Sequence, residues 1–323
     1  MSATMIDVAR LAGVSVGTVS NVVRGARPVA ETTREQVLRA MDDLDYRPNA
    51  VAGALKRGAT HTLGFIFTDL LNPYFGILAL AVERLAREAG YSVLLANSNG
   101  DQDLELAHVR AFVERRVDGV VIPSMTEHSR IADELLERSI PTVCVGFSDN
   151  DPRLGAIDCD EEGAMAEVAA HLLELGHERV AFKYQETRDH AVDRRPTALR
   201  GALHERGVEL VELTDEPTAI CCTNDVVAIA LIGDLVARGV AIPRDVSIVG
   251  FDDIPMAAHP LIGLTTVHFD AQATGEVVME RLLRAIAESQ HVSERITLGA
   301  SLVVRSTTGT APSRRNGARR RGR

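Results

Sequence analysis

The stretch that decides the architecture of the N-terminal region is "IDVARLAGVSVGTVSNVV", residues Ile6–Val23. It contains two short runs with apolar side chains at helical spacing, and Gly13 and Ser15 lie between them. Glycine accepts the left-handed backbone that ends a helix, and serine caps the start of the next one. The stretch therefore predicts two short helices joined by a tight turn, the first over about Ile6–Ala12.

A third helix is predicted to begin after Thr32 or Thr33. Small Ala9 allows close approach of the first two helices, Gly13 makes the turn, and Val19 locks the second helix across the first, as a helix-turn-helix requires. The alternative is a three-helix cap without a role in DNA binding. The side chains expected to face inward are Val8, Leu11, Ala12, Val19, Val22, Val23, Val37, Leu38, Met41 and Leu44.

The segment "YRPNAVAGALKRGAT", Tyr46–Thr60, continues the pattern. Pro48 ends the third helix, and Asn49 can cap a short helix through Leu55. With "DVARLAGVSVGTVSNVV", "TREQVLRAMDDLDYRPN" and "AVAGAL", the first 58 residues closely resemble the DNA-binding domain of the LacI/GalR (lactose repressor/galactose repressor) family of transcription factors. The resemblance implies that the second helix lies in the major groove and that the short hinge helix enters the minor groove.

The resemblance assigns base edges to residues of the second helix and a wedge in the central base step to Leu55, which would kink the duplex. Gly17 has no side chain, so readout there must come from Val16, Asn21 or DNA shape. Gly53 lowers the helix propensity of the hinge, so we expect a hinge helix that folds on the operator. The implied DNA-binding residues are Thr4, Ser15, Val16, Gly17, Thr18, Ser20, Asn21, Arg24, Asn49, Ala52, Leu55 and Arg57.

From Leu63 onward, apolar strand patterns such as "LGFIFTD" and "VSIVGFDD" alternate with amphipathic helices. This alternation predicts an α/β body with two lobes, each a parallel sheet covered by helices on both faces. Ligands bind beyond the carboxyl ends of such strands. Each polar residue at a strand tip could also be a helix cap or a turn residue; they are Asp69, Ser98, Ser124, Asn224, Asp225 and Asp252.

The family resemblance extends to about residue 308 through "GFIFTDLLNPYF", "DGVVIPS", "PTAICCTNDVVAIA", "VSIVGFDDIPMAAHPLIGLTTV" and "LVVRSTT". It implies a body like a periplasmic sugar-binding protein, with lobe 1 over about 61–158 and 270–290 and lobe 2 over about 160–268 and 292–308. The chain would cross between the lobes near Ile157–Glu161, near His268–Asp270 and near residues 290–295. These boundaries divide the chain into a DNA-binding domain (1–58, hinge helix about 49–57), a body (59–308) and a disordered basic tail (309–323).

A small effector in the cleft between the lobes is implied, and a sugar or sugar derivative is expected. Carboxylate and amide groups can hold sugar hydroxyls and an aromatic ring can stack on the sugar, although a purine would need similar groups. Arg195 lies in "RPTAL", which departs from the family's Arg-x-x-Gly-Phe. The implied effector-binding residues are Asp69, Tyr74, Phe75, Ser124, Arg195, Asn224, Asp252 and Phe269.

Two further departures concern lobe 2. Between "LRGALHERGVELVEL" and "EPTAI" roughly one βα unit of about 25 residues is missing. After the strand "VAF", Lys183, Tyr184 and Gln185 replace the glycines common in the family. A regulator with an impaired or absent effector response is therefore the alternative.

The charge distribution is uneven: the net charge is −10, but residues 1–58 carry eight Lys/Arg against six Asp/Glu, and residues 309–323 carry six Arg and no acid. Basic ends on an acidic body favour contact with a polyanion. The sequence has no long apolar run and no secretory signal, so we expect a cytoplasmic protein. The four cysteines, expected to be buried free thiols, and the ten histidines lack metal spacing, so no metal or cofactor is predicted.

Two other functions are the alternatives. A solute-binding receptor would share the two-lobed body but would need export. A metabolic enzyme would need a phosphate loop, a dinucleotide fingerprint or a nucleophile elbow, and the sequence contains none of these motifs. A homodimer on a pseudo-palindromic operator is expected, because one recognition helix reads too few base pairs for specificity. The tail lacks a leucine heptad, so a tetramerising coiled coil is not predicted.

Overall fold

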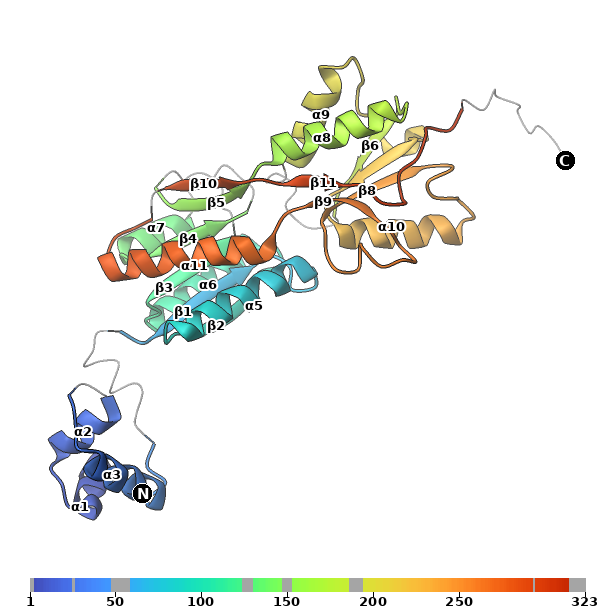
Figure 1. Ribbon diagram of the computed structural model, residues 1–323. Coiled ribbons are helices and arrows are strands. Elements are labelled where there is room, and N and C mark those ends of the chain that lie inside the picture. Colours follow the sequence, from blue (N-terminus) through green and yellow to red (C-terminus); the bar gives the residue numbers. More distant parts are fainter. Residues whose placement is uncertain are drawn as a thin grey trace. The chain divides into compact units, whose positions relative to one another are not determined.

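The computed structural model describes residues 3–24, 27–47, 59–123, 130–146, 153–185, 194–292 and 294–313. The chain forms two compact units, Met1–Thr60 and His61–Arg323 (Figure 1). Among the described residues, no single helix is long and apolar enough to cross a membrane. The predicted hinge helix with Asn49, Ala52, Leu55 and Arg57, the side chain of Arg24, and Ser124 lie outside the described residues.

The N-terminal unit contains α1 (Met5–Ala12), α2 (Val16–Arg24) and α3 (Glu31–Asp43). The chain bends by 105° between α1 and α2, within the range of a helix-turn-helix. Thr4 and Asp7 form a capping box at the start of α1, where the backbone N–H of Thr4 donates to the Asp7 carboxylate at 3.0 Å. Gly13, with φ +65°, ends α1 in the predicted left-handed conformation.

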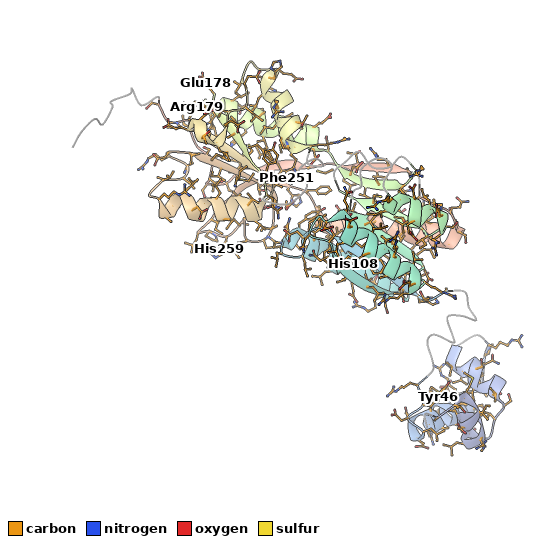
Figure 2. All side chains as sticks on the ribbon, turned by 180° about the vertical axis from the view of Figure 1, so that it is seen from behind. Tyr46, His108, Glu178, Arg179, Phe251 and His259 are labelled. Carbon is orange, nitrogen blue, oxygen red and sulfur yellow. The ribbon has the colours of Figure 1, made fainter. Side chains whose placement is uncertain are left out.

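The core of this unit is formed by Val8, Ala9, Val19, Val37 and Ala40, and Tyr46 packs against it (Figure 2). Two inward-facing predictions were wrong, because Leu11 is 54% exposed and Leu38 is 43% exposed. The two small alanines of the core let the helices pack closely. The buried face of α1 is therefore centred on Val8 and Ala9 and that of α3 on Val37 and Ala40, and the two leucines lie at the edges of these faces. Helix α3 also begins before the predicted threonines, since the Ala30 carbonyl accepts from the Arg34 N–H at 3.0 Å.

Lobe 1 of the body is a parallel sheet in the order β10-β5-β4-β3-β1-β2. Its inner strands are almost fully apolar because helices cover both faces. Side chains of β1 alternate between two cores, one shared with α5 and α11 and the other with α6 and α7. The elements are β1 (Thr62–Phe67), α5 (Pro73–Glu88), β2 (Ser92–Asn97), α6 (Gln102–Glu114), β3 (Gly119–Pro123), α7 (Arg130–Glu137), β4 (Thr142–Val145), β5 (Gly155–Cys159), α11 (Ala271–Glu288) and β10 (Arg295–Leu298).

Lobe 2 is a sheet in the order β11-β9-β8-β7-β6, parallel except for β11. Helices α8 and α9 pack together on one face, and α10 covers the other (Figure 1). The predicted two-lobed α/β body is therefore confirmed. The elements are α8 (Glu161–Glu174), β6 (Val180–Lys183), α9 (Arg195–His204), β7 (Ala219–Cys222), α10 (Asp225–Ala237), β8 (Ser247–Asp252), β9 (Thr265–His268) and β11 (Ser301–Val303).

The chain passes between the lobes three times. The first two passages, between β5 and α8 and between β9 and α11, lie where they were predicted. The third was predicted near residues 290–295 but lies at 299–300, because Arg295–Leu298 pairs in parallel with β5. The Arg295 guanidinium, 3.3 Å from the Asp158 carboxylate, supports this pairing. Lobe 1 therefore extends to Leu298, and lobe 2 resumes at Ser301.

The predicted shortening of lobe 2 is visible between α9 and β7. Where an edge strand was expected, Leu210 forms only an isolated parallel bridge with Val180. The expected helix is replaced by one 3-10 turn, η1 (Leu213–Asp215). Helix α10 covers the other face of the sheet. Its sequence is apolar almost all round, yet Asp225 and Ala228 are its only fully buried residues.

The beginning of the C-terminal tail corrects another prediction. Residues 309–313 were expected to be disordered, but they pack along lobe 2. The Gly309 carbonyl accepts from His177 Nε2 at 3.0 Å, and the Ala311 N–H donates to the Leu175 carbonyl at 2.8 Å. These backbone contacts leave no periodic pattern in the sequence, so the prediction missed them. Residues 314–323 lie outside the described part of the chain.

Candidate DNA-recognition helix and interlobe site

The start of α2 is an exposed surface held by a local hydrogen-bond pattern. Ser15 accepts from the Thr18 N–H at 3.0 Å through its hydroxyl, as predicted for a capping residue. Val19 is fully buried and fixes the helix on α1. Val16 is 42% exposed, and a Cβ added at Gly17 would contact only the Ser15 hydroxyl, at 3.5 Å. The predicted Thr18, Ser20 and Asn21 are half-buried along the same helix.

The electrostatics of this unit suit an anionic partner. Helix α2 has no acidic residue in its first turn, so its positive end is uncompensated there. Arg27 and Arg34 are exposed and form no ion pair within the described residues, whereas Arg10 and Arg39 pair with acids of their own helices. Arg27 and Arg34 were not among the DNA-binding residues predicted from the sequence, although their position between α2 and the first turn of α3 marks them.

In the body, one side chain joins the two lobes at the predicted strand tips. The Nε2 of Gln185, which follows β6 in lobe 2, donates to Asp69 Oδ2 in lobe 1 at 2.9 Å. Its Oε1 accepts from Asn224 Nδ2 at 3.1 Å. Asn224 also caps α10, since its Oδ1 accepts from the Val227 N–H at 3.0 Å. That cap fixes the orientation of the Asn224 amide, so its Nδ2 faces Gln185.

A second hydrogen bond joins the lobes. Asn72 caps α5 by accepting from the Tyr74 N–H at 3.1 Å, and its Nδ2 donates to Asp252 Oδ2 at 2.8 Å. Both side chains are buried. Asp252 adopts φ +103°, an unusual value for a residue other than glycine. We refer to Asp69, Asn72, Gln185, Asn224 and Asp252 as the interlobe site.

The predicted aromatic residues lie beside this site and pack on one another. The rings of Tyr74 and Phe269 stack with centroids 5.7 Å apart and planes 15° apart. Phe75 stacks on Phe67 at 6.4 Å. Burial, with a smaller contribution from the Asp252 carboxylate, raises the pKa of Tyr74, so its phenol stays neutral. The stacked pair links α5 of lobe 1 to the second passage between the lobes.

Arg195 is buried and already bonded to the chain. Its Nη1 donates to the Thr223 carbonyl at 2.7 Å, and its Nε lies 3.4 Å from a carboxylate oxygen of Glu161. The guanidinium also makes a cation–π contact, 4.8 Å from the centre of the ring of Phe251, which is labelled in Figure 2. The positive charge of Arg195, which was predicted to bind an effector, is thus compensated by Glu161, a residue not predicted from the sequence.

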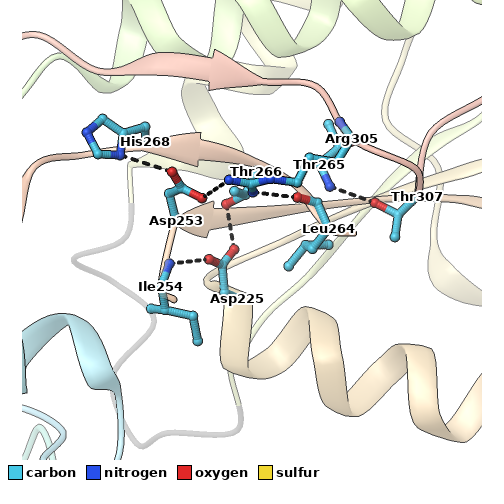
Figure 3. A network of polar contacts seen from close by, with 9 residues as sticks. All are labelled: Asp225, Asp253, Ile254, Leu264, Thr265, Thr266, His268, Arg305 and Thr307. Atoms are coloured by element: carbon cyan, nitrogen blue, oxygen red, sulfur yellow. Dashed lines mark hydrogen bonds and ion pairs between the residues drawn. The ribbon is translucent and has the colours of Figure 1, made fainter. Parts of the chain in front are cut away.

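Two of the polar strand tips stabilise the fold. Asp225 accepts from the Ile254 N–H at 2.9 Å and from the Thr266 hydroxyl at 2.5 Å, which joins the start of α10 to β9 (Figure 3). Burial raises the pKa of Asp225 to about 8. Ser98 is buried and donates to Glu105 at 2.9 Å, which ties the end of β2 to α6.

An ion-pair network lies close to Asp225 in the same lobe. Asp253 accepts from Arg305 Nη2 at 2.6 Å and pairs with His268 Nδ1 at 3.1 Å (Figure 3). The Nη1 of Arg305 donates to the Leu264 carbonyl at 2.8 Å. This network connects β8 and β9 with the segment that follows β11, next to the second passage between the lobes.

The structure thus places Asp69 and Asp252 in hydrogen bonds between the lobes and connects Asn224 to Asp69 through Gln185. The Tyr74 and Phe269 rings lie beside them. Arg195 lies behind them in lobe 2, and Phe75 belongs to the aromatic core of lobe 1. Asn72, Gln185 and Glu161 were missed as site residues. Asn72 before Pro73 resembles any helix cap, and only the departure of Gln185 from glycine marked that position.

Family models match nearly the whole chain. Residues 4–49 match the model described as bacterial regulatory proteins, lacI family. Residues 60–215 match the periplasmic binding proteins and sugar binding domain of the LacI family, and residues 169–308 match a periplasmic binding protein-like domain. The matches cover both units of the structure.

Curated relatives and solved structures agree with these models. The chain is 31% identical to the HTH-type transcriptional repressor PurR of Photobacterium profundum, over 94% of this chain and 98% of that protein. It is 33% identical to the PurR repressor of Vibrio atlanticus, over 95% and 99%. The lac repressor dimer bound to operator and an anti-inducer superposes with a TM-score of 0.84 at 26% identity, over 96% of this chain and 100% of that one. The regulator CelR in complex with cellobiose gives 0.68 at 26%, over 94% and 99%.

Proposed function

The chain belongs to the LacI family of bacterial regulatory proteins and is a transcriptional regulator, and from this we propose that it represses genes by binding a two-fold symmetric DNA operator. The observation that carries the proposal is the N-terminal unit. Helix α2 starts on an exposed, acid-free surface, at a 105° bend from α1. A helix presented in this way fits the major groove of DNA.

In this proposal the residues of α2 divide the tasks of recognition. Asn21 and Val16 read base edges, since an amide can pair with adenine and an apolar side chain can contact a thymine methyl group. The hydroxyls of Ser15, Thr18 and Ser20 bind phosphates. The remaining proposed contacts are Thr4, Gly17, Arg24, Arg27 and Arg34, with Asn49, Ala52, Leu55 and Arg57 of the hinge.

The proposed effector is a small neutral compound, a sugar or sugar derivative, bound between the lobes. Asp69, Asn224 and Asp252 supply acceptors and donors there, next to the Tyr74 and Phe269 rings. The charge of Arg195 is already compensated by Glu161, which disfavours an acidic effector. The proposed target genes are those of carbohydrate or related catabolism, and Ser124 and Phe75 complete the proposed effector set.

We propose a homodimer as the operator-binding form. Helix α5 exposes Leu80 (71%) beside a hollow of about 480 Å³ that α11 also lines. Its rim carries both signs of charge, including Glu83 and Arg87, which pair at 3.0 Å. A two-fold interface must be complementary to itself, and a surface of mixed charge around apolar side chains meets that condition. The proposed regulator acts in the cytoplasm and catalyses no reaction, because a DNA-reading unit on this body suits neither an enzyme nor an exported receptor.

Footprinting on the DNA upstream of the protein's own gene tests this function. The expected result is protection of one two-fold symmetric site by the full chain, and loss of that protection in Asn21→Ala. The matched control is Asn99→Ala, which changes the same residue type on an exposed turn of the body. Uniform, salt-sensitive binding with no protected site would contradict sequence-specific recognition.

A further inference from the structure

Both polar atoms of the Gln185 side chain and its backbone N–H form hydrogen bonds. The side chain is half-buried, and its Nε2 and Oε1 join Asp69 of lobe 1 to Asn224 of lobe 2. Its backbone N–H donates to the Thr223 hydroxyl at 3.3 Å. The carboxamide therefore lies between two residues that the family resemblance assigns to an effector, and it satisfies both of them.

We propose that Gln185 is an internal ligand: its carboxamide occupies the polar centre of the interlobe site and holds the two lobes together when no small molecule is bound. A carboxamide offers one donor and one acceptor side by side. Asp69 needs a donor and Asn224 Nδ2 needs an acceptor, so Gln185 supplies both at once. The Asn72–Asp252 hydrogen bond closes a second point of the same site.

This arrangement also makes Gln185 a determinant of ligand specificity, a step that rests on the proposed effector-controlled function. A compound that displaces Gln185 must donate to Asp69 and accept from Asn224, which one hydroxyl group or one carboxamide can do. An anionic compound would meet the carboxylates of Asp69 and Asp252, while Arg195 is held by Glu161. The displacing compounds are therefore neutral hydroxyl or amide compounds.

A small molecule can bind only to those protein molecules in which Gln185 has left the site. Its apparent affinity is therefore the intrinsic affinity multiplied by the fraction of such molecules. Hydrogen bonds to a charged group have a larger net effect than neutral ones, so loss of the Gln185–Asp69 contact should shift the balance between joined and separated lobes by about tenfold. The weak effector response expected from the shortened lobe 2 thus has a second cause, which one substitution can test separately.

The test uses the full chain without DNA. It first removes the donor of the Gln185–Asp69 hydrogen bond and then restores the bond with donor and acceptor exchanged. Gln185→Glu places a carboxylate against Asp69, so the lobes should separate: the radius of gyration from X-ray scattering rises and amide hydrogens near residues 69–72 exchange about tenfold faster. Adding Asp69→Asn to Gln185→Glu exchanges donor and acceptor, so both readouts should return toward wild type. Gln290→Glu, the same change at an exposed residue after α11, is the matched control.

A binding measurement completes the test and does not depend on the stability of the charged variant. In Gln185→Ala, neutral D-glucose should raise the melting temperature at concentrations that leave the wild type unchanged, while D-gluconate should not. The proposal is overturned if Gln185→Glu behaves as Gln290→Glu does, if the double variant stays as open as the single one, or if glucose does not distinguish Gln185→Ala from wild type. None of these readouts requires operator binding, so failure of the proposed DNA function would be seen separately in the footprint.

Discussion

Single side chains in this protein combine a local contact with a distant one. Asn224 caps α10 and reaches Gln185, and Asn72 caps α5 and reaches Asp252. Loss of a helix cap alone costs about 1 kcal/mol. Substitution of Asn72 therefore weakens a helix start and a contact between the lobes together, and substitution of Asn224 weakens a helix start and the support of Gln185. Gln185 makes the contact with Asp69 without capping a described helix, so it is the cleaner place to separate the two effects.

Gly17 gives a prediction that separates stability from DNA binding. The position has room for a methyl group, and alanine favours a helix over glycine by up to about 1 kcal/mol. Gly17→Ala should therefore slow amide exchange in α2, yet change operator affinity, because the methyl group lies on the surface proposed to face the bases. Gly201→Ala in α9, where nothing lies within 4 Å of an added Cβ, is the control. Unchanged operator affinity in Gly17→Ala would remove Gly17 from the interface.

Asp225 gives a pH prediction with a defined sign. Burial raises its pKa in the folded protein to about 8, whereas an unfolded chain has an ordinary value of about 3.9. The stabilising contribution of the protonated form is full below about pH 4 and is lost as the pH rises through about 8. Asp225→Asn removes this titration, so its unfolding free energy should fall less than that of wild type between about pH 5 and about pH 8.5. The unfolding free energies of both proteins can be measured by urea unfolding across this pH range. If the two pH profiles run parallel, the Asp225 carboxyl is ionised throughout and the prediction is wrong.

At the scale of elements, lobe 2 has lost protection on one side. Strand β6 pairs fully with β7, but among the described residues its other edge has only the bridge to Leu210. The 3-10 turn η1 stands where a helix was expected, and the largely apolar α10 is partly exposed: Val236 is 58% exposed. Edge strands without partners open more readily than central ones.

Hydrogen exchange should show this loss strand by strand. The amides of β6 are expected to exchange at least tenfold faster than those of β8, which lies between two paired strands. Strand β3 of lobe 1, also central in its sheet, is the reference for a lobe of full size. Equal protection of β6, β8 and β3 would mean that the short segment between α9 and β7 shields the edge as well as a complete strand and helix.

Much of this element structure could be predicted from sequence, for reasons that individual residues make clear. Gly13 and Ser15 set the ends of α1 and α2 by local geometry, and the alternation of apolar strands and helices follows from burial on both faces. The third passage at 299–300 was missed because Arg295–Leu298 gains its place from pairing with distant β5. The contact of Gln185 with Asp69, 116 residues earlier, likewise exists only in three dimensions.

At the scale of the whole molecule, the proposed regulation depends on two copies acting together. Leu80→Glu should leave the fold intact, since the side chain is 71% exposed, but should separate the proposed dimer. Each copy would then read one half-site, and operator affinity should fall by at least about tenfold. Sedimentation and operator titration measure both effects. Leu104→Glu, at a 37% exposed position of α6, is the control, and a dimeric Leu80→Glu variant with wild-type affinity would contradict this interface.

Recognition of DNA by α2 is tested most sharply by selecting duplexes from a random DNA pool with the purified full chain, at one fixed salt concentration. We expect enrichment of one two-fold symmetric sequence, with a changed half-site preference in Asn21→Ala and an unchanged one in Gly201→Ala. Enrichment of no sequence, or of the same sequence by wild type and Asn21→Ala, would contradict a recognition helix formed by Val16–Arg24.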